Sequence, residues 1–195
     1  QEMYTMQELI EQFSLERVSK SGAKFDYEKG KWFNHQYLQL RSNEELAEQF
    51  MPYLEKAIGD GLLAIDKATV AKVIGLTKDR VNFVSELWEQ VNFFFVAPTE
   101  YDEKSLKKRW KEDSPKHMTE MLSLLEAHAD WSAEGLDNLI MPWIAEKEYG
   151  VGIVMNAFRI CLVGAARGPH IWNITDVLGK DETLRRVRTA LEKLG

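Results

Sequence analysis

The sequence predicts an all-helical protein made of two packed helical bundles. Apolar residues recur every three or four positions along most of the chain, which is the period of one helix face. Alternation of apolar and polar residues, which is typical of a half-buried strand, is short wherever it occurs. Of the 195 residues, 45% are hydrophobic and 29% are charged, which is the composition of a folded domain and not of a disordered segment.

Three apolar stripes predict the helices of the first bundle. One stripe holds Met6, Leu9, Ile10 and Phe13, and a second runs from Leu46 to Ile58. The third and clearest stripe predicts one long helix and contains Val81, Val84, Leu87, Trp88, Val91, Phe94 and Phe95. We expect an irregular segment at residues 19–34 and a helix-to-helix turn at Asp60 and Gly61.

Caps and stop signals predict the helices of the second bundle. Ser132 is a plausible N-cap, Gly150 a stop signal, and Pro142 predicts a kink or a division into two shorter helices. Gly179 is expected to end one helix before the last one, which Asp181 can cap. The buried stripes consist of Met118, Met121, Leu122 and Leu125, of Leu136, Leu139, Ile140, Trp143 and Ile144, and of Leu184, Val187, Leu191 and Leu194.

The best boundary between the two bundles lies at Pro98, directly after the aromatic end of the long stripe. We therefore expect one helical domain at residues 1–97 and another at residues 98–195. The chain begins with Gln1 and not with Met, so we expect a fragment or a processed product.

Composition limits the setting and the chemistry. The net charge of −6 argues against a wholly basic nucleic-acid binder but leaves room for a local basic face. A single cysteine, Cys161, fits a reducing compartment, and no apolar run reaches the roughly 20 residues of a membrane span. We expect a cytoplasmic protein with no membrane partner.

The sequence offers no convincing catalytic set. The four histidines and Cys161 lack metal-ligand spacing, so we expect no metal site. Cys161 lies in an apolar run and is expected to be a buried thiol, although His170 could be imagined as its catalytic base. Residues 59–61 read as a turn and not as a phosphate loop.

Three separated segments resemble bacterial glutamyl-tRNA synthetases, in the order that the family has them. The first reads FSLERVSKSGAKFD at residues 13–26 and continues as KWFNHQYL at residues 31–38. The second runs from Gly164 to Leu178, and the third is LGKDETLRR at residues 178–186. Residues 18–21, VSKS, also look like the ATP-contacting loop of class I synthetases, but without the nucleotide-binding sheet we interpret them as a solvated basic turn.

The resemblance implies a stem-contact and linker domain at residues 1–97, followed by an anticodon-binding domain at residues 98–195. It also implies a parent enzyme that joins glutamate to tRNA with ATP and magnesium bound in a catalytic domain outside this chain. The chain alone would then bind no cofactor and would not aminoacylate. Its expected partner is tRNA for glutamate and not DNA, and its expected state is a monomer.

The same resemblance implies the residues that contact the anticodon. Arg80 matches an arginine that reads the third anticodon base, and Arg159 matches an arginine near the anticodon nucleotides. The turn formed by Gly168, Pro169, His170 and Ile171 matches a loop that cradles the bases, although some family members have threonine where Gly168 stands. Arginine suits this task because its planar fork donates several hydrogen bonds and stacks on bases.

Each of these positions also has a simpler interpretation. Arg80 could be an ordinary solvated charge, and Arg159 could be a helix-surface charge that pairs with a nearby acid. Gly168 with Pro169 could form an ordinary turn. His170 is expected to be exposed and Trp172 to belong to the core, whereas Ile171 could belong to the core or to a shelf for base stacking.

Two basic clusters are candidates for phosphate contacts, and either could be only a solvated surface. The first cluster consists of Lys104, Lys107, Lys108, Arg109 and Lys111, and the second of Arg185, Arg186 and Arg188. Within them, the candidates for phosphate contacts are Lys107, Lys108, Arg109, Arg185 and Arg186. An all-helical interaction scaffold without RNA binding is the main alternative function, because the acidic composition and the helical stripes fit it equally well. A free-standing hydrolase or thiol enzyme ranks third.

Overall fold

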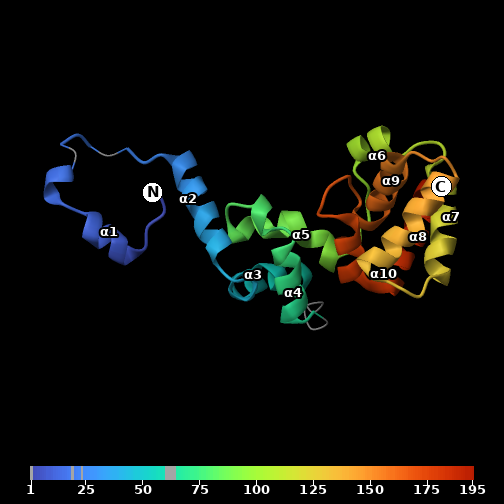
Figure 1. Cartoon of the computed structure of the whole chain (residues 1–195), viewed down its shortest axis with the longest axis horizontal. Helices are drawn as coiled ribbons and strands as arrows, with labels where there is room; N and C mark the ends of the chain where they lie inside the picture. Colours follow the sequence, from blue (N-terminus) through green and yellow to red (C-terminus); the bar gives the residue numbers. More distant parts are fainter. Residues whose placement is uncertain (1, 19, 23, 60–64) are drawn as a thin grey trace.

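The computed structural model describes residues 2–18, 20–22, 24–59 and 65–195. Within these ranges the regular structure consists of α-helices and short 3-10 turns without a strand, which confirms the all-helical prediction. Figure 1 shows an N-terminal arm, a middle group of helices and a C-terminal bundle following one another along the long axis of the molecule.

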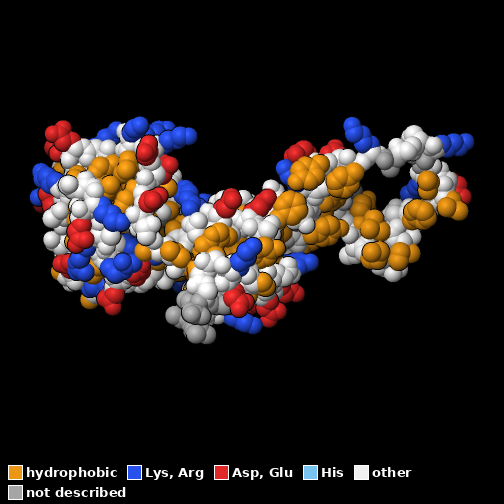
Figure 2. Space-filling view, turned by 180° about the vertical axis from the view of Figure 1, so that it is seen from behind, with side chains coloured by type: hydrophobic (Ala, Val, Ile, Leu, Met, Phe, Trp, Pro, Cys, Tyr) orange, Lys and Arg blue, Asp and Glu red, His pale blue; other side chains and the backbone are white. Residues whose placement is uncertain are grey.

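The N-terminal arm holds α1 (Met6–Gln12), the 3-10 turn η1 (Leu15–Arg17) and α2 (Tyr27–Leu40). The expected irregular segment therefore ends earlier than predicted, because Asp26 accepts a hydrogen bond from the Lys29 backbone and starts α2. The apolar stripe of α1 is helical as predicted, but it joins no core and is exposed (Figure 2). The Val18-to-Ser21 motif includes Ser19, which lies outside the described residues.

The middle group consists of α3 (Asn43–Ile58), α4 (Lys67–Gly75), η3 (Lys78–Arg80), η4 (Val84–Glu86) and α5 (Leu87–Phe95). The prediction of one helix through the stripe from Val81 to Phe95 is wrong at its start. Val81 is extended, and the Glu86 carboxylate accepts hydrogen bonds from the backbone of Asn82 and Phe83, so a regular helix begins only at Leu87. The turn expected at Asp60 and Gly61 lies outside the described residues.

The C-terminal bundle contains α6 (Glu103–Arg109), α7 (Ser114–Ala127), α8 (Ala133–Glu146), α9 (Val151–Val163) and α10 (Ile171–Leu194). Ser132 caps α8 as predicted, but α8 runs through Pro142 as one helix. Gly150 is the N-cap of α9 and not the stop signal of α8. Gly179, with a φ of 74°, breaks the helical backbone inside α10 at the residue where one helix was expected to end and the last one to follow.

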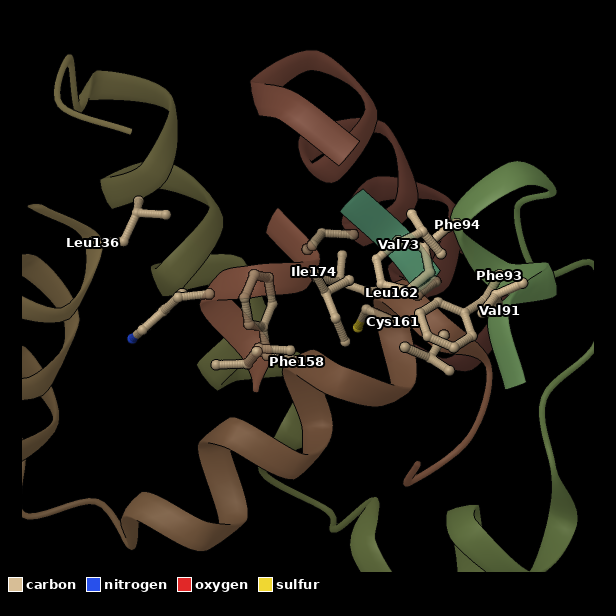
Figure 3. Close-up of a cluster of buried hydrophobic side chains, with 14 of the residues drawn as sticks. Val73, Val91, Phe93, Phe94, Leu136, Phe158, Cys161, Leu162 and Ile174 are labelled. Atoms are coloured by element: carbon tan, nitrogen blue, oxygen red, sulfur yellow. The ribbon is translucent and has the colours of Figure 1, made fainter. Parts of the chain in front are cut away.

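A continuous hydrophobic core joins the middle group to the C-terminal bundle. Figure 3 shows Phe93 and Phe94 of α5 near Cys161 and Leu162 of α9 and Ile174 of α10. Cys161 is fully buried, and burial raises the pKa of its thiol far above the usual range, which confirms the prediction of a buried, unreactive cysteine. Because α5 packs on both α9 and α10, a division of the chain between residues 97 and 98 stays a prediction.

Candidate nucleic-acid interface

The turn between α9 and α10 is organised around the side chain of Arg159. Its Nη1 atom donates hydrogen bonds to the backbone carbonyls of Arg167 at 3.2 Å and Pro169 at 2.6 Å. These two bonds hold residues 167–169 against α9, so Arg159 fixes the shape of the turn while the rest of its guanidinium keeps further donors. The simple interpretation of Arg159 as a free surface charge is therefore wrong.

The turn itself needs glycine at two places. Gly164 ends α9 with a φ of 79°, and a Cβ atom there would lie 2.8 Å from the Pro98 ring and 2.9 Å from the Glu100 carbonyl oxygen. Gly168 has a φ of 106°, and a Cβ atom would lie 3.1 Å from the ring of Phe93. The departure from threonine at position 168 thus suits the backbone that this chain adopts.

The other residues of the turn differ in what they can offer to a ligand. His170 is the N-cap residue of α10 and is exposed, as predicted. Pro169 is buried, and Ile171 and Trp172 are only 3% and 2% exposed, so the side chain of Ile171 belongs to the core and forms no stacking shelf. Pro169 and Ile171 can present only main-chain atoms to RNA.

Arg80 lies at the end of η3, not at the start of a helix. Its side chain is 40% exposed, and its ion pair with the neighbouring Asp79 is long, at 3.9 Å. An exposed ion pair of this length holds a side chain weakly. The guanidinium of Arg80 is therefore available to a ligand.

Arg80 and Arg159 come from two groups of helices, and the fold places them within electrostatic range of each other. The pKa of Arg159 is lowered, first by burial and then by the nearby positive charge of Arg80. Two neighbouring guanidinium groups repel each other, and an acceptor or an anion placed between them relieves that repulsion. This pair and the turn at residues 164–170 make up the candidate surface, which we call the recognition surface.

Arg167 is a further member of this surface that the sequence reasoning missed. Its guanidinium lies 5.5 Å from the ring centre of Phe93, and it donates hydrogen bonds to the carbonyl of Glu89 and, at 3.0 Å, to Asn92 Oδ1. Arg167 thus ties the turn to α5 while remaining exposed. The only signal in the sequence was an arginine placed directly before Gly168 and Pro169.

The two basic clusters differ in their exposure to solvent. Lys107, Lys108 and Arg109 are exposed in the last turn of α6, and Figure 2 shows basic side chains gathered over the end of the bundle where α6 lies. The first turn of α6 adjoins the turn at residues 164–170 of the recognition surface. Ala166 N donates a hydrogen bond to Ser105 Oγ at 3.0 Å, and Asp102 N donates one to the Gly164 carbonyl at 2.8 Å.

The second cluster is paired and partly buried. Arg185 is bound to Glu182 at 2.6 Å. The prediction of a phosphate contact for Arg186 is wrong, because its side chain is 3% exposed and its Nη1 donates to the carbonyls of Phe93 and Leu162. The buried guanidinium serves the fold and cannot reach a phosphate.

In the described part of the chain, no three His, Cys, Asp or Glu side chains gather closely enough to hold a metal ion. Likewise, no described helix combines the length and the apolar character needed to cross a bilayer.

Comparison with known families places this surface in context. A family model described as an anticodon binding domain matches residues 45–191, which include the recognition surface. The chain belongs to the anticodon-binding domain family.

Relatives of this anticodon-binding domain are glutamate–tRNA ligases. The ligases of Phocaeicola vulgatus and Porphyromonas gingivalis W83 are 55% and 52% identical over 195 residues, which is 100% of this chain and 38% of each relative. The chain thus spans well under half the length of these relatives and corresponds to their carboxy-terminal part. The resemblance to glutamyl-tRNA synthetases is confirmed.

Two solved structures of glutamate–tRNA ligases contain a region with the same fold as this chain. The crystal structure of a glutamate–tRNA ligase from Elizabethkingia meningosepticum in complex with its amino acid has a TM-score of 0.91 and 36% identity, covering 100% of this chain and 38% of that one. The synthetase structure from Elizabethkingia anophelis has a TM-score of 0.86 and 35% identity, covering 98% of this chain and 37% of that one. The anticodon-binding domain therefore has the fold of the corresponding part of these enzymes.

Proposed function

We propose that this chain is the tRNA-recognition module of a glutamate–tRNA ligase and that it binds the anticodon of tRNA for glutamate. The observation that carries the proposal is the turn held by the hydrogen bonds of Arg159, together with the available side chain of Arg80, in a chain of the anticodon-binding family. Anticodon bases are unpaired and present their Watson–Crick edges, which arginine forks read well.

Each part of the recognition surface then has a task. Arg80 reads the third anticodon base, Arg159 shapes the turn and contacts the neighbouring nucleotides, and Gly168 with Pro169 lets main-chain atoms approach the bases. His170 is the exposed ring of the turn and can stack on a base. Phosphate contacts fall to Lys107, Lys108 and Arg109, because α6 is bound to the turn by two hydrogen bonds.

The remainder of the parent protein supplies the chemistry. ATP and magnesium bind there, glutamate is joined to tRNA there, and this chain alone has no ligase activity. We further propose that the chain acts as a monomer in the cytoplasm, with neither DNA nor a membrane as a partner.

Filter binding or fluorescence anisotropy with two tRNA transcripts tests the proposal. One transcript has the glutamate anticodon, and the other differs only in the third anticodon base, changed to that of glutamine anticodons. The chain should prefer the first, and Arg80→Gln should reduce this preference by about tenfold. Arg188→Gln is the matched control, because it removes the same charge from the exposed face of α10, where Arg188 pairs with Glu126.

The result also decides between RNA binding and a protein-interaction scaffold. Binding to tRNA that weakens steeply between 50 and 200 mM salt, roughly in proportion to the phosphates contacted, supports the module. No binding of either transcript, or an unchanged preference in Arg80→Gln, contradicts it and leaves the scaffold as the better explanation.

A further inference from the structure

We propose that α2 is a positioning element for Arg80, and that Asn34, His35 and Gln39 hold the backbone from which Arg80 projects. This inference rests on the proposed role of Arg80. It adds residues that lie on a helix without recognition residues of its own, 39 to 48 positions earlier in the chain than the groups they bind.

Three side chains of α2 donate to backbone carbonyls on both sides of Arg80. Gln39 Nε2 donates to the Lys78 carbonyl at 2.8 Å, two residues before Arg80. His35 Nδ1 donates to the Val81 carbonyl at 2.8 Å, directly after Arg80, and Asn34 Nδ2 donates to the Asn82 carbonyl. The carbonyls that precede and follow the arginine are thus held by the same helix.

Residues 78–83, which contain Arg80, also donate a side-chain hydrogen bond to the end of α2. Lys78 Nζ donates to the Arg41 carbonyl at 3.2 Å, at the C-terminal end of α2, where helix carbonyls lack helical partners. On the far side of the segment, Glu86 accepts hydrogen bonds from the backbone of Asn82 at 2.8 Å and Phe83 at 3.3 Å. Residues 78–83 are therefore held from two directions, although they form only a short 3-10 turn and an extended stretch.

For a helix of 14 residues, α2 buries little apolar surface against the rest of the molecule. Leu38 is its one buried residue, and its main contact is with η3, so α2 adds little to the hydrophobic core. Its polar face does most of the binding. A helix placed only to enlarge the core would bury an apolar stripe there instead.

The side chain of Arg80 is held far less firmly than its backbone. The Arg80 side chain is 40% exposed and has only the long contact to Asp79, whereas its backbone is fixed from both sides. A fixed backbone restricts where the guanidinium can reach and lowers the entropy lost when it binds a base. We therefore infer that α2 contributes to the choice between anticodons without touching RNA.

The test uses the full 195-residue chain and the two transcripts described above. His35→Phe and Gln39→Met each remove one donor with little change in volume, and the double variant removes both. Gln36→Met is the matched control, because Gln36 lies on the same helix and its side chain makes no hydrogen bond to the described part of the chain. Arg80→Gln shows what complete loss of the reading arginine does.

We expect the double variant to lose about five- to tenfold in its preference between the transcripts, and each single variant about two- to threefold. The salt dependence of binding should stay unchanged, because no phosphate contact is altered. Backbone amides of residues 78–83 should exchange faster with solvent, while those of α9 and α10 keep their protection. A purely structural role would lower the melting temperature without moving the preference.

The outcomes separate this inference from the function on which it rests. If Arg80→Gln loses the preference but the double variant keeps it, α2 does not position Arg80 and the proposed function stands. If Arg80→Gln also keeps the preference, the role of Arg80 is wrong and the inference falls with it. Should the double variant unfold at the assay temperature, the single variants decide, and an unchanged preference in both overturns the proposal.

Discussion

Arg159 lies within electrostatic range of Arg80: burial lowers the pKa of the Arg159 guanidinium most, and the positive charge of Arg80 lowers it further. The two residues come from η3 and α9, and Arg80 also forms a long ion pair with Asp79, at 3.9 Å. A surface that holds two like charges together is less stable than the same surface with one charge.

Removing one of the two charges should therefore increase the stability of the fold while it weakens recognition of the anticodon. Arg80→Gln is expected to raise the free energy of unfolding by up to about 0.5 kcal/mol at low salt, and the gain should vanish at 1 M salt because of screening. Urea denaturation at both salt concentrations measures this effect. Arg80→Lys keeps the charge and should show no gain; a loss of stability in Arg80→Gln would contradict the repulsion.

The buried guanidinium of Arg186 predicts a large loss of stability on substitution. Arg186→Met should lower the free energy of unfolding by about 3 kcal/mol, because the carbonyls of Phe93 and Leu162 lose a buried donor. Arg185→Met, next to it, is the control and should change stability by less than about 1 kcal/mol, since Arg185 is half exposed. Equal effects of the two substitutions in urea melts would argue against a structural role peculiar to Arg186.

Glu182 predicts a pH dependence of stability. Its pKa is lowered from 4.5, chiefly by the hydrogen bond from Arg185; burial opposes this as the second-largest effect, and the hydrogen bond of Arg186 and the charges of both arginines lower the pKa further. Because the folded pKa lies below the unfolded one, the contribution of Glu182 is fully present above pH 4.5 and is lost as the pH falls through the folded pKa. Melting curves of the wild type and Glu182→Gln should differ at pH 7 and converge as the pH falls below the folded pKa, whereas a constant difference would show that the carboxylate is not the cause.

Two glycines that differ in backbone conformation should respond oppositely to alanine. Gly168→Ala is expected to cost about 1–2 kcal/mol, because a φ of 106° is strained for any residue with a Cβ and Phe93 lies 3.1 Å from that atom. Gly152→Ala, in the first turn of α9 with open space around it, should stabilise the chain by up to about 1 kcal/mol. Thermal melts of both variants compare the two, and a neutral Gly168→Ala would mean that the turn adapts easily.

The sequence predicted best those helices whose apolar stripe and cap agree. Ser132 and the stripe that begins at Leu136 located α8, and the stripe from Met118 to Leu125 located α7. It failed for α2, because that helix binds its neighbours through polar side chains and buries only Leu38. It also extended the α5 stripe too far, because local hydrogen bonds of Glu86 override the period of the apolar residues.

For the recognition surface, the sequence supplied residues but not their arrangement. The resemblance identified Arg80 and Arg159 separately, and only the fold shows that the charge of one acts on the other. A run of basic letters could not distinguish the exposed Arg185 from the buried Arg186, since neighbouring positions on a helix face in different directions. Arg167 was missed because nothing in its local pattern indicates that it reaches α5.

The hydrogen bonds of Arg186 also determine when a newly synthesised chain can complete its fold. Its partner carbonyl at Phe93 is 93 positions away in the chain, so α5 must wait for α10 before this contact can form. Long-range contacts of this kind are commonly made late in folding, and losing one then speeds unfolding more than it slows folding. A newly made chain would thus acquire its resistance to unfolding only when α10 docks, after the recognition surface has been translated.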